Sequence, residues 1–129
     1  LGEDKGPGKR SGLEAFKEVD DVSIMAIPGV TIPAVQSALV AHCEALANRF
    51  AILDMPYDTR SVDDMQTHRS YFDSNYGAIY HPWLQIYDPL LRTSGFFPPS
   101  AAMESMPAQI IHAGCLRHRQ MRLYAAVPV

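Results

Sequence analysis

Asp54 is the residue whose type and position come nearest to those of a catalytic or binding group. It lies near the end of the apolar run 50–55 (FAILDM), and open α/β sheets bind ligands beside the carboxyl ends of parallel strands. The sequence offers it no recognisable partner, because the GxSxG nucleophile elbow and the phosphate-binding patterns GxxxxGKS/T and GxGxxG are absent. Asp side chains readily bond nearby backbone, so we interpret Asp54 as a strand-end cap or turn residue.

Four further side chains are of the types that bind zinc, namely His42, Cys43, His68 and His81. Neighbouring helix residues point about 100° apart, so His42 and Cys43 would not converge on one ion. No pair among the four has the i, i+4 spacing of a helical metal site. We therefore expect structural roles for all four residues and no metal site.

The remaining candidates each have a structural and a functional interpretation. Residues 81–83 (HPW) could stack on a base or a sugar, but aromatic residues in strands more often pack on a neighbouring layer. Asp63 and Asp64 suit the positive end of a helix. A small anion could bind at the helix starts expected at Thr31 or Ser61, because such ends present free N–H groups.

The composition is that of an ordinary globular chain with at most one domain: 129 residues, 47% hydrophobic and 19% charged. A net charge of -3 gives no basic field for nucleic acid or an anionic membrane.

Cys43 and Cys115 form neither a CxxC motif nor a disulfide framework. No run approaches the roughly 20 apolar residues of a membrane span, and the polar start lacks a signal peptide, so we expect a cytosolic chain. Because it starts with Leu1, we expect the N-terminus to be incomplete.

Three short runs predict strands. Residues 22–27 (VSIMAI) and 50–55 are nearly continuous apolar segments, typical of strands buried on both faces of a parallel sheet. Residues 78–87 (AIYHPWLQIY) predict a third strand, in which Pro82 removes a ladder donor and indicates a bulge or a sheet edge. Residues 92–100 (RTSGFFPPS) predict a loop.

Helical spacing separates these runs. Apolar positions over 31–49 fall on one face, with Thr31 as the expected cap and Pro33 in the first turn. Ser61, with Asp64 three residues on, resembles a capping box that begins the next helix.

The order strand, helix, strand, helix, strand with short connections predicts parallel pairing through crossovers. We therefore predict an α/β fold, a three-layer βαβαβ fragment with a mainly parallel sheet over residues 20–90. Ahead of it, residues 1–12 are rich in Gly and charge and predict a flexible loop, and apolar spacing over 11–19 predicts a short helix.

The most specific patterns are HCE (42–44) with RFAILD (49–54), YHPW (80–83) followed by DP (88–89), and PPS (98–100). In this order and at these intervals, residues 7–103 resemble the later part of the subtilisin-like domain of phage contractile tail sheath proteins. Similar subunits occur in contractile bacteriocins and related injection machines.

This resemblance implies assembly and no catalysis. Sheath subunits stack as rings around a tail tube, and contraction drives the tube through a target envelope. The domain is subtilisin-like in fold but has no protease triad, so we expect no catalytic residues, no cofactor-binding or metal-binding residues and no cofactor. The expected partners are other sheath subunits and the tail tube protein, joined by terminal arms that add strands to a neighbour's sheet. We expect neither nucleic acid nor membrane as a partner. The parent would reside in the virion tail sheath, and this prophage-encoded fragment in the cytoplasm of the bacterial host, unable to assemble alone.

Two other classes of function stay open at this point. One is a degenerate subtilisin-type hydrolase, which requires a Ser and a His that meet Asp54. The other is a small anion-binding βαβ module that uses the helix start at Thr31 or Ser61.

The last two dozen residues depart from the family pattern. Sheath proteins continue after PPS with a pattern like AGIYARTD, a short spacer and APANE, whereas this chain reads MESMPAQIIHAGCLRHRQMRLYAAVPV. When the codons from Met106 are read one base out of frame with free synonymous choice, they can encode ARTDHPRRVFTAPANEAVRGGAG. We therefore divide the chain into a loop (1–12), a partial sheath domain (13–103) and a frameshifted, poorly ordered tail (104–129).

Overall fold

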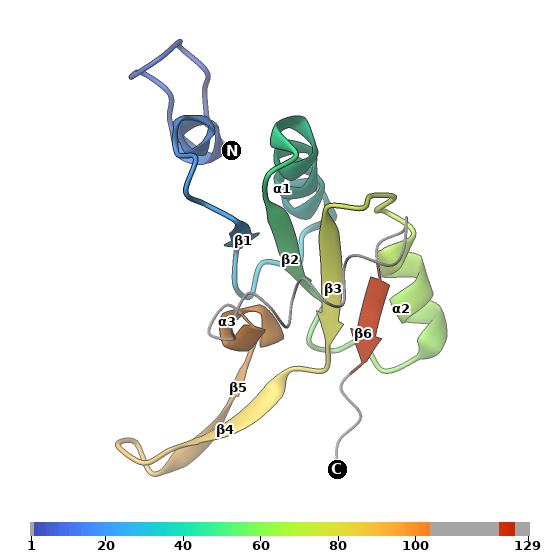
Figure 1. Cartoon of the computed structure of the whole chain (residues 1–129). Helices are drawn as coiled ribbons and strands as arrows, with labels where there is room; N and C mark the ends of the chain where they lie inside the picture. The colour runs from blue at the N-terminus through green and yellow to red at the C-terminus, as the bar shows by residue number, and fades with distance from the viewer. Residues whose placement is uncertain (1, 104–121, 126–129) are drawn as a thin grey trace.

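The computed structural model describes residues 2–103 and the backbone of residues 122–125 (Figure 1). The chain is of mixed α/β class. Its elements, in order, are the 3₁₀ helix η1 (Gly12–Glu18), β1 (Ile24–Ala26), α1 (Pro33–Leu46), β2 (Phe50–Asp54), α2 (Val62–Arg69), β3 (Gly77–His81), β4 (Leu84–Asp88), β5 (Thr93–Phe97), α3 (Pro99–Met103) and β6 (Arg122–Ala125). No helix in the described part is long and apolar enough to cross a membrane.

The main sheet has the strand order β1-β2-β3-β6, and all three neighbouring pairs are parallel. The predicted parallel pairing of the first three strands is thus confirmed, with Ile24 opposite Phe50 and Asp54 opposite Tyr80. The four residues of β2 after Phe50 are buried, as expected for a strand with neighbours on both sides.

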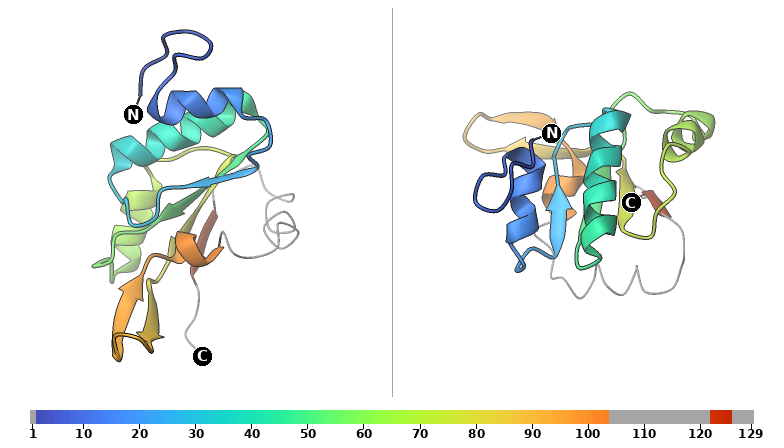
Figure 2. Two further views of the ribbon diagram at one scale, coloured as in Figure 1. Left: turned by 90° about the vertical axis from the view of Figure 1, so that its left-hand side faces the viewer. Right: turned by 90° about the horizontal axis from the view of Figure 1, so that it is seen from above.

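The hydrophobic core lies between the sheet and helix α1, which packs against β2 (Figure 2). Side chains alternate between the two faces of a strand, so Ala51, Leu53 and Met55 share the face that meets Leu39 and Cys43 of α1. Ile52 and Asp54 therefore point to the opposite face of β2, where helix α3 packs.

The helix boundaries follow local chemistry, with one correction. Pro33 occupies the first turn of α1 as predicted, but the N-cap is Ile32 and no side chain caps the helix, so the expected Thr31 cap was wrong. Proline removes one of the free N–H groups at this end and lowers the need for a cap. Helix α1 ends at Leu46 with Ala47 in the left-handed region. The predicted cap of α2 is confirmed, because the Ser61 hydroxyl accepts from the Asp64 N–H at 3.1 Å.

The predicted third strand is in fact two strands in different sheets. β3 ends at His81, the His81-Pro82 peptide is cis, and β4 begins at Leu84. β4 pairs in antiparallel fashion with β5, which occupies residues predicted to be a loop. Leu84 lies opposite Phe97 in this pairing. Contacts between residues that are distant in the sequence therefore stabilise β5, although its Gly and Ser residues are typical of a loop. The hairpin projects away from the main sheet (Figures 1 and 2).

The tail of residues 104–129 is described only at β6, which pairs in parallel with β3. The backbone of these four residues lies along the edge of β3, where N–H and C=O groups are available to an extended segment. Residues 104–121 and 126–129 lie outside the described part of the chain.

Candidate functional site

Asp54 is the centre of a buried junction between three segments. Its side-chain Oδ2 accepts hydrogen bonds from the Gly29 N–H at 2.9 Å and from the Ser100 hydroxyl at 2.7 Å. Its Oδ1 accepts from the Ser100 N–H at 2.8 Å. Asp54 is 1% exposed and Ser100 is fully buried. One carboxylate thus ties the end of β2 to the turn after β1 and to the start of α3.

The local shape of this junction depends on Gly29 and on the face of β2. Gly29 has φ +78°, a region that glycine adopts without strain, and this conformation turns its N–H toward Asp54. The interpretation of Asp54 as a residue that bonds backbone is confirmed, although its partners lie 25 and 46 residues away.

The junction does not have the arrangement of a hydrolase. The Ser100 hydroxyl donates directly to the Asp54 carboxylate, and no histidine bonds to either side chain among the described residues. A serine nucleophile needs a base that takes its proton and an opening for substrate, and fully buried Ser100 has neither here.

A second network lies on the α1 side of β2. The Gln36 amide nitrogen donates to the backbone oxygens of Val30 at 3.0 Å and Asp54 at 2.8 Å, and its oxygen lies 2.9 Å from His68 Nε2. Because this oxygen is an acceptor, His68 carries its proton on Nε2 and presents a free lone pair at Nδ1. Burial lowers the pKa of His68, which keeps the ring neutral.

A third network is built around Arg49, which is 3% exposed. Its guanidinium donates to the backbone oxygens of Phe16 at 2.9 Å and Val19 at 2.8 Å, and to the Asn48 side chain at 3.0 Å. The same group lies 3.4 Å from His42 Nε2, which must accept because arginine is only a donor. Burial first and the Arg49 charge second lower the pKa of His42. Arg49 thus holds the segment around η1 to the end of α1.

The other candidates from the sequence also have structural positions. Burial raises the pKa of the Cys43 thiol to about 11, so this cysteine is not a nucleophile at neutral pH. No group of three potential metal ligands occurs among the described residues. Trp83 donates to the Met55 backbone oxygen at 2.9 Å and packs edge-on against Tyr57, which supports the packing interpretation of residues 81–83.

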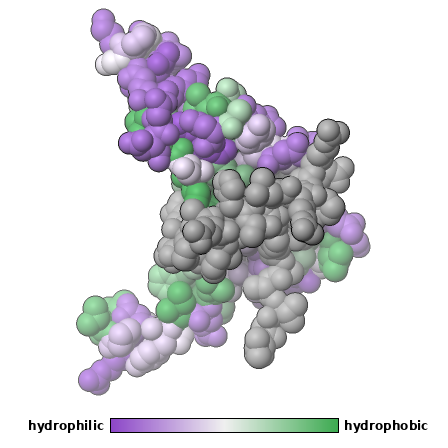
Figure 3. Space-filling view, viewed as in Figure 1, coloured by the Kyte–Doolittle hydropathy of each residue, from purple (hydrophilic) through white to green (hydrophobic). Residues whose placement is uncertain are grey.

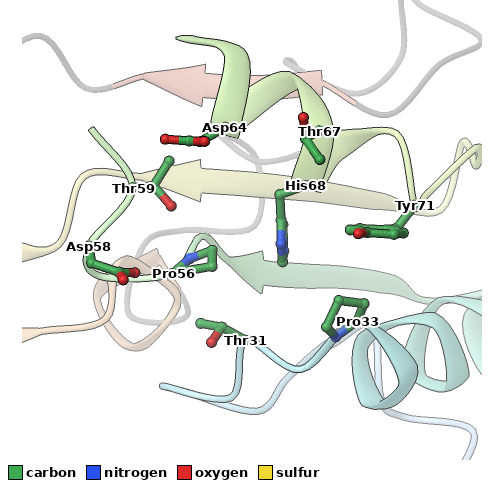
Figure 4. Close-up of a pocket in the computed structure, with 9 residues that line it drawn as sticks. All are labelled: Thr31, Pro33, Pro56, Asp58, Thr59, Asp64, Thr67, His68 and Tyr71. Carbon is green, nitrogen blue, oxygen red and sulfur yellow. The ribbon is translucent and has the colours of Figure 1, made fainter. Parts of the chain in front are cut away.

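A cavity of about 470 Å³ opens at the carboxyl ends of β1 and β2, between the turns that follow them and helix α2 (Figure 4). The sequence did not reveal it, because its walls come from separate loops. Figure 4 shows the His68 ring directed into its centre. Its lining comprises Thr31, Pro33, Pro56, Asp58, Thr59, Asp64, Thr67, His68 and Tyr71.

Comparison of the chain with protein-family models and with curated proteins finds no match.

The buried histidines predict how stability depends on pH. Burial lowers the pKa of His42, His68 and His81 in the folded state, whereas in the unfolded chain they titrate near 6.5. The unfolded state therefore binds protons first, so we expect the free energy of unfolding to fall as pH drops below about 6.5 and to be level above about 7.5. Urea denaturation at a series of pH values below about 6.5 measures the slope of the free energy of unfolding against pH, to which each histidine can add up to about 1.4 kcal/mol per pH unit. A slope unchanged in the His42→Gln/His68→Gln variant would contradict this assignment.

Proposed function

We propose that this chain is part of a structural subunit of a contractile tail sheath, derived from the subtilisin-like domain of a phage or prophage protein. In the intact parent this domain would have three layers, polymerise around the tail tube and contract to drive the tube through a target envelope. The partners would be other sheath subunits and the tube protein, and the site of action the virion tail.

Several residues of the patterns that carry the resemblance support a scaffold role, because they form hydrogen bonds between separate segments of the fold. Asp54 of RFAILD binds Ser100 of PPS, and Trp83 of YHPW donates to the backbone oxygen of Met55. His42 of HCE accepts from Arg49. Polar groups used in this way define the shape of a subunit and are not available to a substrate.

The observation that carries the proposal is the hairpin of β4 and β5, which presents large apolar side chains to solvent (Figure 3). Leu90 is 91% exposed and Leu91 is 73% exposed at its tip. Further exposed apolar residues on its strands are Ile86, Tyr87, Phe96 and Phe97. Figure 3 shows apolar colour at the tip of the hairpin and again near its base, with more polar residues between them. Exposed apolar side chains on a projecting hairpin suit a subunit that functions by joining its neighbours.

The coding DNA on both sides of residues 7–103 tests the origin of the chain. We expect sheath sequence to continue upstream in the same frame, and the patterns AGIYARTD and APANE to follow downstream in a shifted frame. Flanking DNA that carries neither pattern in any frame would reject both the sheath assignment and the frameshift.

The hairpin tip gives a test at the level of the protein. We expect the purified chain to form no sheath but to self-associate weakly as its concentration rises, and we expect Leu90→Ser/Leu91→Ser to reduce this self-association in analytical ultracentrifugation. Because both leucines are exposed, the free energy of unfolding should change by no more than about 0.5 kcal/mol. If the variant and the unmodified chain associate equally, the hairpin tip is not the contact surface. A large loss of stability would instead assign the leucines to the fold.

A further inference from the structure

The N-terminal segment, residues 2–19, is attached to the rest of the fold with little apolar burial. No residue of η1 is buried, although Leu13 packs against the hydrophobic core as a partly buried residue. The loop before η1 bonds to η1 itself, because the Gly8 N–H donates to the Glu18 carboxylate at 2.8 Å. η1 in turn lies beside α1 (Figure 2). Loop and η1 thus form one unit, whose attachment depends strongly on the bonds from Arg49.

His42 meets the same guanidinium nitrogen that holds this segment. Arg49 Nη1 donates to the Phe16 backbone oxygen at 2.9 Å and lies 3.4 Å from His42 Nε2. Nε2 is the acceptor, so the neutral ring carries its proton on Nδ1, which is buried and has no hydrogen-bond partner among the described residues. A proton on Nε2 would turn this acceptor into a donor that faces Arg49 with like charge, and it would leave a charged N–H unsatisfied at Nδ1. The attached segment therefore favours a neutral His42.

The other charges that face His42 come from η1. Burial first, and then the Arg49 charge, lower the pKa of His42, whereas Glu14 of η1 raises it and Lys17 of η1 lowers it. Glu14 is the one group among these that would welcome a protonated ring, and its carboxylate already forms an ion pair with Lys17. The surroundings of His42 thus resist protonation as long as η1 and Arg49 stay in place.

We propose that His42 and Arg49 form an acid-released latch on the N-terminal segment. Protonation of His42 Nε2 removes its contact with Arg49 Nη1 and releases residues 2–19 from α1, while the parallel sheet stays folded. In the released state the ring regains water and titrates near its ordinary pKa of about 6.5, so this state binds protons first. Its population therefore rises as pH falls below about 6.5, by at most about tenfold per pH unit for one group, and is level above about 7.5. The inference is independent of the sheath proposal, because it rests on contacts within the chain.

The test is amide hydrogen exchange of the ¹⁵N-labelled full chain, followed by NMR between about pH 7.5 and about pH 5.5 and corrected for the intrinsic rate at each pH. The Val19 N–H, which donates to the Phe16 oxygen at 3.2 Å, reports on the segment. The Ala51 N–H, which donates to the Tyr76 oxygen at 2.8 Å, reports on the sheet. We expect the protection of Val19 to fall about tenfold over this range and to remain below that of Ala51 at every pH. Equal protection of the two amides would overturn the proposal, because the segment would then leave only when the whole fold opens.

Matched variants assign the response to His42. His42→Gln keeps an oxygen that can accept from Arg49 but has no group that titrates in this range, so the protection of Val19 should be level with pH. His68→Gln is the control, since His68 lies 2.9 Å from Gln36 in the separate network, and the Val19 response should persist. A Val19 response that persists in His42→Gln would overturn the latch.

The ring nitrogens of the unmodified chain give a readout that does not depend on the folding of any variant. We expect their ¹⁵N shifts to show the Nδ1–H tautomer of His42 at neutral pH, and a titration midpoint that coincides with the loss of Val19 protection. The Nε2–H tautomer, or a ring that titrates without any change at Val19, would show that His42 does not act on the segment through Arg49.

Discussion

Asp54→Ala is expected to lower the free energy of unfolding by about 4 kcal/mol. The substitution removes the acceptor of two N–H groups and one hydroxyl, all of them at a site that is 1% exposed. Each buried donor that loses the carboxylate as its acceptor is left unsatisfied and carries a desolvation penalty. Urea denaturation followed by circular dichroism at neutral pH measures the change.

Two variants separate the junction from a general loss of charge. Asp58→Ala removes an exposed carboxylate a few residues further on and should change the free energy of unfolding by no more than about 0.5 kcal/mol. Ser100→Ala removes only the hydroxyl donor and keeps the backbone N–H. It should therefore lower the free energy of unfolding by less than Asp54→Ala does. If Asp54→Ala is no more destabilising than Asp58→Ala, the junction does not hold the fold together.

Arg49→Lys is expected to destabilise the chain by about 3 kcal/mol although it keeps the positive charge. The guanidinium reaches the backbone oxygens of Phe16 and Val19 with separate nitrogens, and a single ammonium cannot span both. At least one carbonyl and the Asn48 side chain lose a charged donor. We also expect faster cleavage after Lys17, because the segment around η1 is held to α1 by these bonds.

Limited trypsin digestion with mass spectrometry measures the cleavage, and urea denaturation measures the stability. Arg60→Lys is the control, since Arg60 is exposed and an exchange there should alter neither quantity. Cleavage after Lys17 at the unmodified rate in Arg49→Lys would show that the segment is held by other contacts.

The parts of the fold that depend on residues close together in the sequence could be predicted from the sequence. FAILDM predicts a buried strand because almost every side chain is apolar, and Ser61 predicts a helix start because its cap bond reaches only three residues ahead. VSIMAI also predicts a strand buried on both faces, but β1 has only three residues and only Met25 among them is buried, because this strand lies at the end of the sheet order. Pro82 also marks an interruption. Its consequence, that residues 84–88 leave the main sheet and pair with residues 93–97, depends on contacts across the hairpin that no local pattern contains.

The candidate site divides in the same way. Asp54 was recognisable from its position at the end of a strand, but Ser100 is 46 residues away and lies in a segment predicted to be a loop. Arg49 binds oxygens of the main chain, which every residue has, so no side-chain pattern marks its partners. The cavity combines side chains from the turns after two strands and from α2, and only the folded backbone brings them together.

The Arg49 bonds also define how the fold would carry mechanical load. Arg49 directly precedes β2, a strand with parallel neighbours on both sides, whereas the three-residue β1 lies at the end of the sheet order. Tension applied to the first residues would pass through the oxygens of Phe16 and Val19 into Arg49 and from there into β2. A pull on the N-terminal segment is then resisted by a central strand of the sheet as well as by the short outer strand β1.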